Sequence, residues 1–199
     1  MAPFFVGRVG ALAAAAFLAL MAAACGGNTP ATTTPVTTTA PAANPGPTAS
    51  SVRDDASLFQ LITQTEPFGA NPLFPNVDEF TTGRLNGSAA HRPVVRVSLN
   101  ARALSALQNG RLPAGSRFPD GSILVKQVRS SAGAPDTLYA VMYRDGTNTL
   151  AGNGWVWAEF GPSGSVAYSV SNRGAGCTGC HLLERGPQND LVRTFERQP

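Results

Sequence analysis

The sequence predicts a mainly β (α+β) fold with a few short helices. Five segments rich in β-branched and aromatic residues predict strands, and turn signals of Gly, Pro, Asn and Asp separate them. They are residues 94–99, 122–129, 138–144, 154–160 and 166–170. No stretch has the length and periodicity of the four long amphipathic helices that an all-α bundle needs.

Three short helices are predicted around these strands. Residues 54–62 begin with two acids that precede an apolar pattern, and residues 100–108 begin with a capping Asn and stop before a glycine. Near the end of the chain, residues 189–197 predict a helix that Asn189 or Asp190 caps.

The first 24 residues predict a secretory signal peptide, because Arg8 precedes an apolar stretch too short to span a membrane. The segment Ala22-Ala23-Ala24-Cys25 is similar to a bacterial lipobox, in which the cysteine is acylated and becomes the mature N-terminus. The alternative is ordinary cleavage nearby, which would leave Cys25 as a free thiol. Acylation predicts an exported protein anchored by lipid to the bacterial membrane, facing the periplasm or the cell exterior.

Residues 25–51 predict a disordered tether between this anchor and the folded domain. From residue 26 they carry no charge and consist mainly of Thr, Pro, Ala, Gly, Asn and Ser, which cannot bury enough apolar surface to fold. Residues 52–199 are left, an ordinary size for one domain. The formal net charge is +3 and the basic residues are scattered, so we expect no nucleic-acid partner.

The segment Cys177-Thr178-Gly179-Cys180-His181 has the CxxCH pattern of a c-type haem attachment site. Two thiols at this spacing can form thioethers with the two vinyl-derived carbons on one haem edge. The next residue then places an imidazole under the iron. The sequence therefore predicts one covalent haem c, held by Cys177 and Cys180, with its iron bound by His181.

Three other uses of a CxxC pair compete with haem attachment. A thioredoxin-like pair needs a strand before it and a helix after it, whereas a Gly-containing turn precedes this pair and Pro187 follows it. A zinc site needs four ligands, and His91 is the only histidine besides His181. A disulfide would suit an exported protein but gives His181 no role.

Lys126 is the only lysine in the sequence. Unlike a guanidinium, an amine can lose its proton when it is desolvated and can then act as a nucleophile. On a strand, Lys126 shares one face with the apolar Leu124 and Val128. These neighbours would partly desolvate the amine and thereby lower the pKa of Lys126. The alternative interpretation is a solvated surface lysine.

Three segments in this order resemble the cytochrome P-460 family and its sister group cytochrome c′-beta. They are Phe118-Pro-Asp-Gly-Ser-Ile-Leu-Val-Lys126, Gly154-Trp-Val-Trp-Ala-Glu-Phe160 and the CxxCH motif. The resemblance covers about residues 94–195 and implies a mainly antiparallel β fold, one c-type haem and a homodimer. In the hydroxylamine-oxidising members a strand lysine is bonded covalently to the porphyrin, and Lys126 stands at the matching place.

The resemblance also implies an open coordination position on the iron. Family members surround it with an acid and an arginine, which suit proton-coupled oxidation, or with aromatic side chains, which suit gas binding. Arg96 is the predicted arginine, with Arg92 as the competing choice. The acid stays open among Asp136, Asp145 and Glu159.

Three functions follow from these assignments. The leading hypothesis is oxidation of hydroxylamine or a related small nitrogen species, with Lys126 and Arg96 in catalytic roles and electrons passed to a partner cytochrome. The second is a non-enzymatic protein that binds nitric oxide, as cytochrome c′-beta does. The third is a plain electron carrier with Met142 or His91 as second axial ligand.

Overall fold

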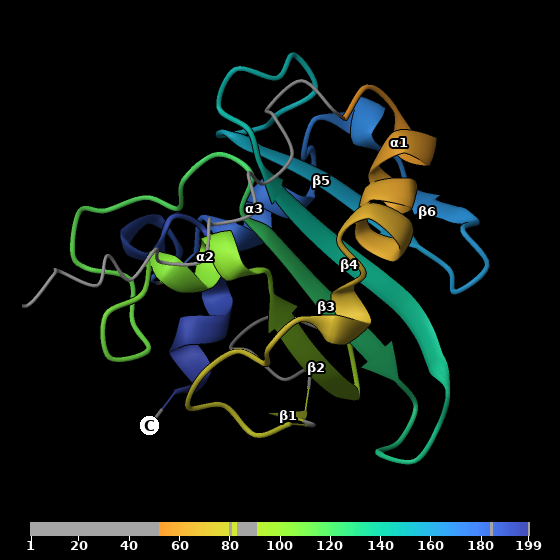
Figure 1. Ribbon diagram of the computed structural model, residues 1–199, viewed down its shortest axis with the longest axis horizontal. Helices are drawn as coiled ribbons and strands as arrows, with labels where there is room; N and C mark the ends of the chain where they lie inside the picture. Colours follow the sequence, from red (N-terminus) through yellow and green to blue (C-terminus); the bar gives the residue numbers. More distant parts are fainter. Residues whose placement is uncertain (1–51, 80, 83–90, 184, 199) are drawn as a thin grey trace, which may run out of the picture. The chain divides into compact units, whose positions relative to one another are not determined.

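The computed structural model describes residues 52–79, 81–82, 91–183 and 185–198. Through this part of the chain runs an antiparallel sheet of six strands, which neighbour one another in chain order (Figure 1). The strands are β1 (Thr81–Thr82), β2 (Val94–Leu99), β3 (Ile123–Arg129), β4 (Asp136–Arg144), β5 (Trp155–Phe160) and β6 (Val166–Tyr168). The mainly β, antiparallel prediction is confirmed, and the two-residue β1 is the strand that the sequence did not predict.

Short helical segments surround the sheet. They are α1 (Asp55–Gln60), the π-helix η1 (Leu61–Thr65), α2 (Ala101–Ser105), α3 (Cys177–His181) and the 3₁₀ helices η2 (Phe68–Ala70), η3 (Val170–Asn172), η4 (Gly186–Asn189) and η5 (Arg193–Arg197). Asp54 caps α1 by accepting a hydrogen bond of 2.8 Å from the backbone N–H of Ser57. Asn100 caps α2 in the same way through Ala103, although α2 ends earlier than residue 108.

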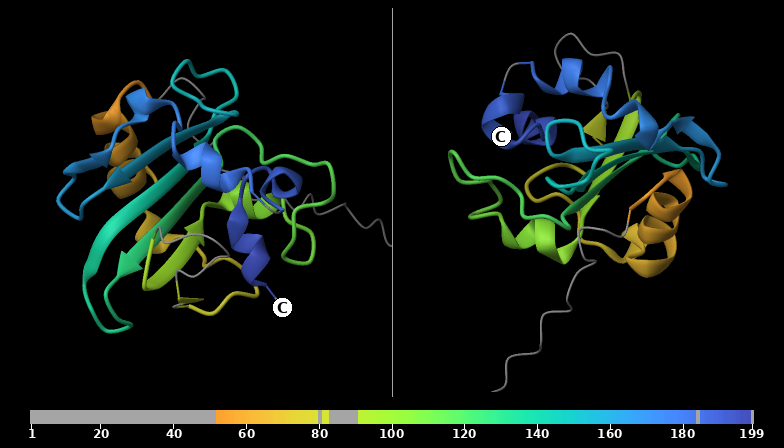
Figure 2. Two further views of the ribbon diagram at one scale, coloured as in Figure 1. Left: turned by 180° about the vertical axis from the view of Figure 1, so that it is seen from behind. Right: turned by 90° about the horizontal axis from the view of Figure 1, so that it is seen from above.

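Each face of the sheet has its own hydrophobic core. Leu58 and Ile62, from α1 and η1, pack on one face with Val125, Val141 and Val156 of the sheet. On the other face the core includes Leu124, Met142, Trp157, Val192 and Phe195. Figure 2 shows α1 and the C-terminal segments on opposite faces of the sheet. The C-terminal segments therefore cover one face alone.

One row of paired residues crosses the sheet on the face that the C-terminal segments cover. Each member pairs with the next across neighbouring strands, from β2 to β6, so their side chains share that face. The row is Val97, Lys126, Ala140, Glu159 and Tyr168. A lysine and a glutamate thus stand on this face with one alanine between them.

The helix predicted over residues 189–197 forms only in part, because two 3₁₀ segments replace a continuous helix. The chain forms η4 and η5 instead, and between them Asp190 and Leu191 adopt positive φ angles of 49° and 69°. A right-handed helix cannot pass through two such residues. The Trp155 indole N–H donates a hydrogen bond of 2.9 Å to the Asp190 carbonyl, so a tertiary contact satisfies a group that a helix would have used.

The predicted signal peptide (residues 1–24), the acylation site Cys25 and the tether (residues 25–51) lie outside the described residues. Among the residues that are described, no helix has the length and apolar character needed to cross a membrane.

Candidate haem site

A cavity of about 300 Å³ lies between the C-terminal segments and the face of the sheet that carries Lys126 and Glu159. The sheet lines it with Leu124, Lys126, Ala140, Met142, Trp157 and Glu159. The segments opposite line it with Cys177, Cys180, His181, Val192, Arg193 and Arg197. The fold thus brings both motif cysteines, the motif histidine and the single lysine into one cavity of a size that ligand sites commonly have.

The CxxCH motif forms the helix α3 beside this cavity. Cys177 and Cys180 are three residues apart and therefore lie on the same side of the helix. Both are free thiols and partly buried. Gly176 precedes the helix with a φ of 87°, a conformation that glycine adopts without strain. Two free thiols on one helical side suit attachment to a group in the cavity.

The ring of His181 is held on two sides. Its Nδ1–H donates a hydrogen bond of 2.6 Å to the Leu191 carbonyl, and the ring packs edge-on against Trp157 with 4.8 Å between centroids. Burial lowers the pKa of His181 to about 4, so the imidazole is neutral at physiological pH. With Nδ1 as the donor, Nε2 keeps the lone pair that a metal ligand needs.

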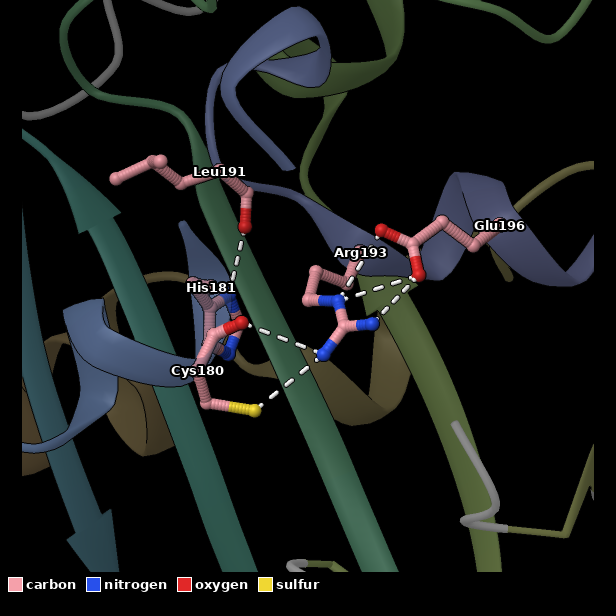
Figure 3. A network of polar contacts seen from close by, with 5 residues as sticks. All are labelled: Cys180, His181, Leu191, Arg193 and Glu196. Atoms are coloured by element: carbon pink, nitrogen blue, oxygen red, sulfur yellow. Dashed lines mark hydrogen bonds and ion pairs between the residues drawn. The ribbon is translucent and has the colours of Figure 1, made fainter. Parts of the chain in front are cut away.

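Arg193 ties the end of α3 to the C-terminal segment (Figure 3). Its Nη1 donates hydrogen bonds to the Cys180 carbonyl at 3.3 Å and to the Cys180 Sγ at 3.4 Å. Its Nη2 pairs with Glu196 at 2.8 Å, and the whole residue is buried. No local sequence pattern indicates this role, because the tertiary fold alone brings Arg193 to α3.

Gly186 lets the chain fold back closely on α3. A Cβ at this position would lie 1.8 Å from the backbone oxygen of His181. We therefore expect Gly186→Ala to destabilise the protein by about 2 kcal/mol or more, because backbone would have to shift. Denaturant unfolding measures the change. Gly133→Ala is the control, because a Cβ there meets nothing within 4 Å, and equal effects of the two changes would contradict this assignment.

Lys126 belongs to a chain of three polar side chains in the cavity. Its Nζ lies 3.5 Å from Nδ1 of His91, and Nε2–H of His91 donates a hydrogen bond of 2.6 Å to Oε1 of Glu159. In this arrangement Nδ1 of His91 is an acceptor that faces the lysine amine. Desolvation, and next the positive charge of Arg197, lower the pKa of Lys126 to about 8.

The pKa of Lys126 can be measured directly because the sequence has no other lysine. In a Cys177→Ala/Cys180→Ala variant labelled by reductive ¹³C-methylation, we expect the lysine NMR signal to titrate near pH 8. The folded state then binds fewer protons than the unfolded state between about pH 8 and 10.5, so the stability cost of burying the Lys126 amine is relieved and the free energy of unfolding increases as pH rises through that window. Lys126→Arg in the same background identifies the signal, and a midpoint near 10.5 would contradict the desolvated site.

Of the three candidate acids, Glu159 reaches the cavity. Asp136 instead accepts hydrogen bonds from Gln127 and Arg129 at the start of β4. Asp145 accepts hydrogen bonds from the side chains of Thr147 and Asn148 in the following turn. The hydrogen bond from His91 lowers the pKa of Glu159, so the carboxylate is ionised at neutral pH.

The structure does not bring Arg96 into the cavity. It neighbours Val97 on β2 and therefore points away from the cavity, and its Nε lies 3.8 Å from Oε1 of Glu79. Arg92 does not line the cavity either, whereas Arg193 and Arg197 do. Both candidates for a second axial ligand, Met142 and His91, line the cavity. The backbone of His91 has a positive φ of 55°.

The residues present fit a c-type haem. The cavity offers two free thiols on one helix, a neutral imidazole with Nε2 available and largely apolar walls. Within the described residues no group of three or more His, Cys, Asp and Glu side chains is placed to hold a metal ion.

The family model described as Cytochrome P460 matches residues 80–194. The matched span contains β1 to β6 and α3, and therefore the row of paired residues, Lys126 and the CxxCH motif. No curated protein matches the sequence.

Proposed function

The chain belongs to the cytochrome P460 family, and from that premise we propose that it oxidises hydroxylamine or a related small nitrogen species and passes the electrons to a partner cytochrome. As a member of this family it is a cytochrome that binds haem and iron. The proposal adds that Cys177 and Cys180 hold the haem by thioethers and that His181 binds the iron. It also adds that Lys126 is bonded to the porphyrin ring.

The proposal extends to the part of the chain before the folded domain. Residues 1–24 direct export, Cys25 carries the lipid, and residues 25–51 hold the domain at a distance from the membrane. The protein then acts at the membrane surface in the periplasm or outside the cell, as a homodimer.

The observation that carries the oxidase proposal is the polar chain of Lys126, His91 and Glu159 in the cavity. Oxidation of hydroxylamine removes protons together with electrons, so the site needs a proton acceptor beside the substrate. When bound, haem supplies the electron-accepting iron and one coordination position for the substrate. Glu159 is ionised and accepts a proton, and His91 holds the carboxylate in place.

Glu159 and His91 are both partly accessible. The side chain of Glu159 is 26% exposed and that of His91 is 18% exposed. Ala140 lies between Lys126 and Glu159 in the row and lines the cavity with a small side chain.

The gas-binding alternative calls for an aromatic wall beside the open position. The aromatic side chains that line the described cavity are Trp157 and Tyr168, and both have other partners. Trp157 packs on the His181 ring and donates to the Gly152 carbonyl, while the Tyr168 hydroxyl donates to the Ala175 carbonyl. The polar chain therefore favours oxidation over gas storage.

Turnover of the haem-loaded protein tests the proposed function. The protein is matured in an exporting host and mixed with hydroxylamine and an artificial electron acceptor, whose reduction is followed by absorbance. We expect catalytic reduction of the acceptor and a high-spin ferrous haem. Tight binding of nitric oxide without turnover would contradict oxidation and support the gas-binding function, and a low-spin, six-coordinate ferrous haem would support electron transfer alone.

A further inference from the structure

Two consecutive residues with positive φ lie directly beside the haem site. Asp190 has a φ of 49° and Leu191 a φ of 69°. Residues with a bulky side chain seldom adopt this conformation, and Leu191 is also buried, at 5% exposure. Contacts from elsewhere in the fold must hold this turn against its own backbone preference.

Those contacts come from the turn before β3 and from the ends of β4 and β5. The Phe118 backbone N–H donates a hydrogen bond of 3.0 Å to Oδ2 of Asp190, and Nε of Arg144 lies 3.5 Å from the same oxygen. The Trp155 indole N–H donates to the Asp190 carbonyl at 2.9 Å. We call Phe118, Arg144, Trp155 and Asp190 the Asp190 clamp.

The clamp is buried and closely fitted. Arg144 and Asp190 are each 7% exposed, and Nε of Arg144 also donates to the Phe118 carbonyl at 3.2 Å. Gly154 has a φ of 81°, and a Cβ there would lie 1.7 Å from Nη1 of Arg144. The guanidinium group of Arg144 therefore lies where three segments meet: the Phe-Pro-Asp-Gly turn, the start of β5 and the Asp190 turn.

The clamp reaches the haem site through a single backbone group. Leu191 follows Asp190, and its carbonyl accepts the hydrogen bond of 2.6 Å from Nδ1–H of His181. The acceptor on Nδ1 fixes the orientation of a ligating imidazole and raises the basicity of its other nitrogen. Any shift of the Asp190 turn would move this acceptor away from His181.

We propose that the Asp190 clamp positions His181 and sets the strength of its bond to the haem iron. The proposal rests on the proposed ligation of iron by His181. It gives the Phe-Pro-Asp-Gly turn a role that the proposed function does not use: Phe118 offers both its N–H and its carbonyl to the clamp. Asp190 is thus a positioning residue that acts through Leu191.

Resonance Raman spectroscopy of the ferrous, haem-loaded protein measures the iron–histidine bond. We expect Asp190→Ala to lower the iron–histidine stretching frequency and to raise the reduction potential, because a weaker hydrogen bond makes His181 a poorer electron donor. Asp190→Asn keeps an acceptor for the Phe118 N–H and loses the ion pair, so it should shift both quantities less.

Asp145→Asn is the matched control. Asp145 is also a buried aspartate and follows Arg144 directly, but its side-chain partners are Thr147 and Asn148. Asp145→Asn should leave the iron–histidine stretching frequency and the reduction potential unchanged. An equal shift in Asp145→Asn, or none in a folded and haem-loaded Asp190→Ala, would overturn the clamp.

A second variant covers the case in which Asp190→Ala does not fold. Arg144→Lys keeps the positive charge and loses the planar guanidinium that contacts both Phe118 and Asp190. A lowered iron–histidine frequency in Arg144→Lys supports the clamp, and a wild-type frequency overturns it. If the ferrous wild-type haem is five-coordinate and still has no iron–histidine mode, the proposed ligation by His181 fails as well, which separates that failure from a failure of the clamp alone.

Discussion

Glu159→Gln is expected to lower the rate of hydroxylamine oxidation by about 100- to 10,000-fold, the usual contribution of a positioned acid or base. The amide matches the carboxylate in size but cannot take up a proton. The haem environment should otherwise be preserved, since Glu159 contacts His91 rather than the CxxCH helix. Steady-state kinetics with an artificial acceptor, together with the absorbance spectrum of the haem, measure both parts of this expectation.

Glu79→Gln is the control for this substitution. Glu79 is more than half exposed and lies 3.8 Å from Arg96, which does not line the cavity. Glu79→Gln should leave the rate of hydroxylamine oxidation within about 2-fold of wild type, as surface changes usually do. A Glu159→Gln protein with nearly wild-type turnover would remove Glu159 from the proton pathway.

Lys126→Arg is expected to abolish the bond between the protein strand and the porphyrin and to lower turnover by roughly 100-fold or more. Arginine keeps the positive charge, but its guanidinium stays protonated at any accessible pH and cannot act as a nucleophile. The haem should remain attached through the two cysteines, with an absorbance spectrum closer to that of an ordinary c-type haem.

Arg96→Lys provides the matched control for the lysine. It adds a second lysine to the same sheet, on the face that does not line the cavity. This lysine should stay unbonded, and turnover should be unchanged. A spectrum and a rate in Lys126→Arg equal to those of wild type would show that Lys126 has no covalent role.

Local sequence patterns predicted most of the fold. β-branched residues between turn signals located β2 to β6, because strand formation and tight turns depend on neighbouring residues. The CxxCH motif is also local, and the structure forms it as a short helix with two free thiols beside a cavity. The C-terminal helix was predicted only in part, because the Trp155 indole, distant in the sequence, binds the Asp190 carbonyl where the helix is interrupted.

The residues that line the cavity can be identified only when the pairing of the strands is known. Lys126 and Glu159 are brought to one face by pairing through Ala140, and nothing near Glu159 in the sequence distinguishes it from Asp136 or Asp145. Side chains alternate between the two faces along a strand, which explains why Val97 of β2 lines the cavity and its neighbour Arg96 does not. His91 joins Lys126 from a turn that no local pattern predicts.

The most direct test of the account is peptide mass mapping of the haem-loaded protein after trypsin digestion. Trypsin cuts after Arg117, Arg129, Arg173 and Arg185, and after Lys126 only if its side chain is unmodified. We expect one species in which peptide 118–129, uncut at Lys126, and peptide 174–185 are joined through haem. Haem on peptide 174–185 alone, with free peptides 118–126 and 127–129, would contradict the bond to Lys126 and leave gas binding or electron transfer as the better hypothesis.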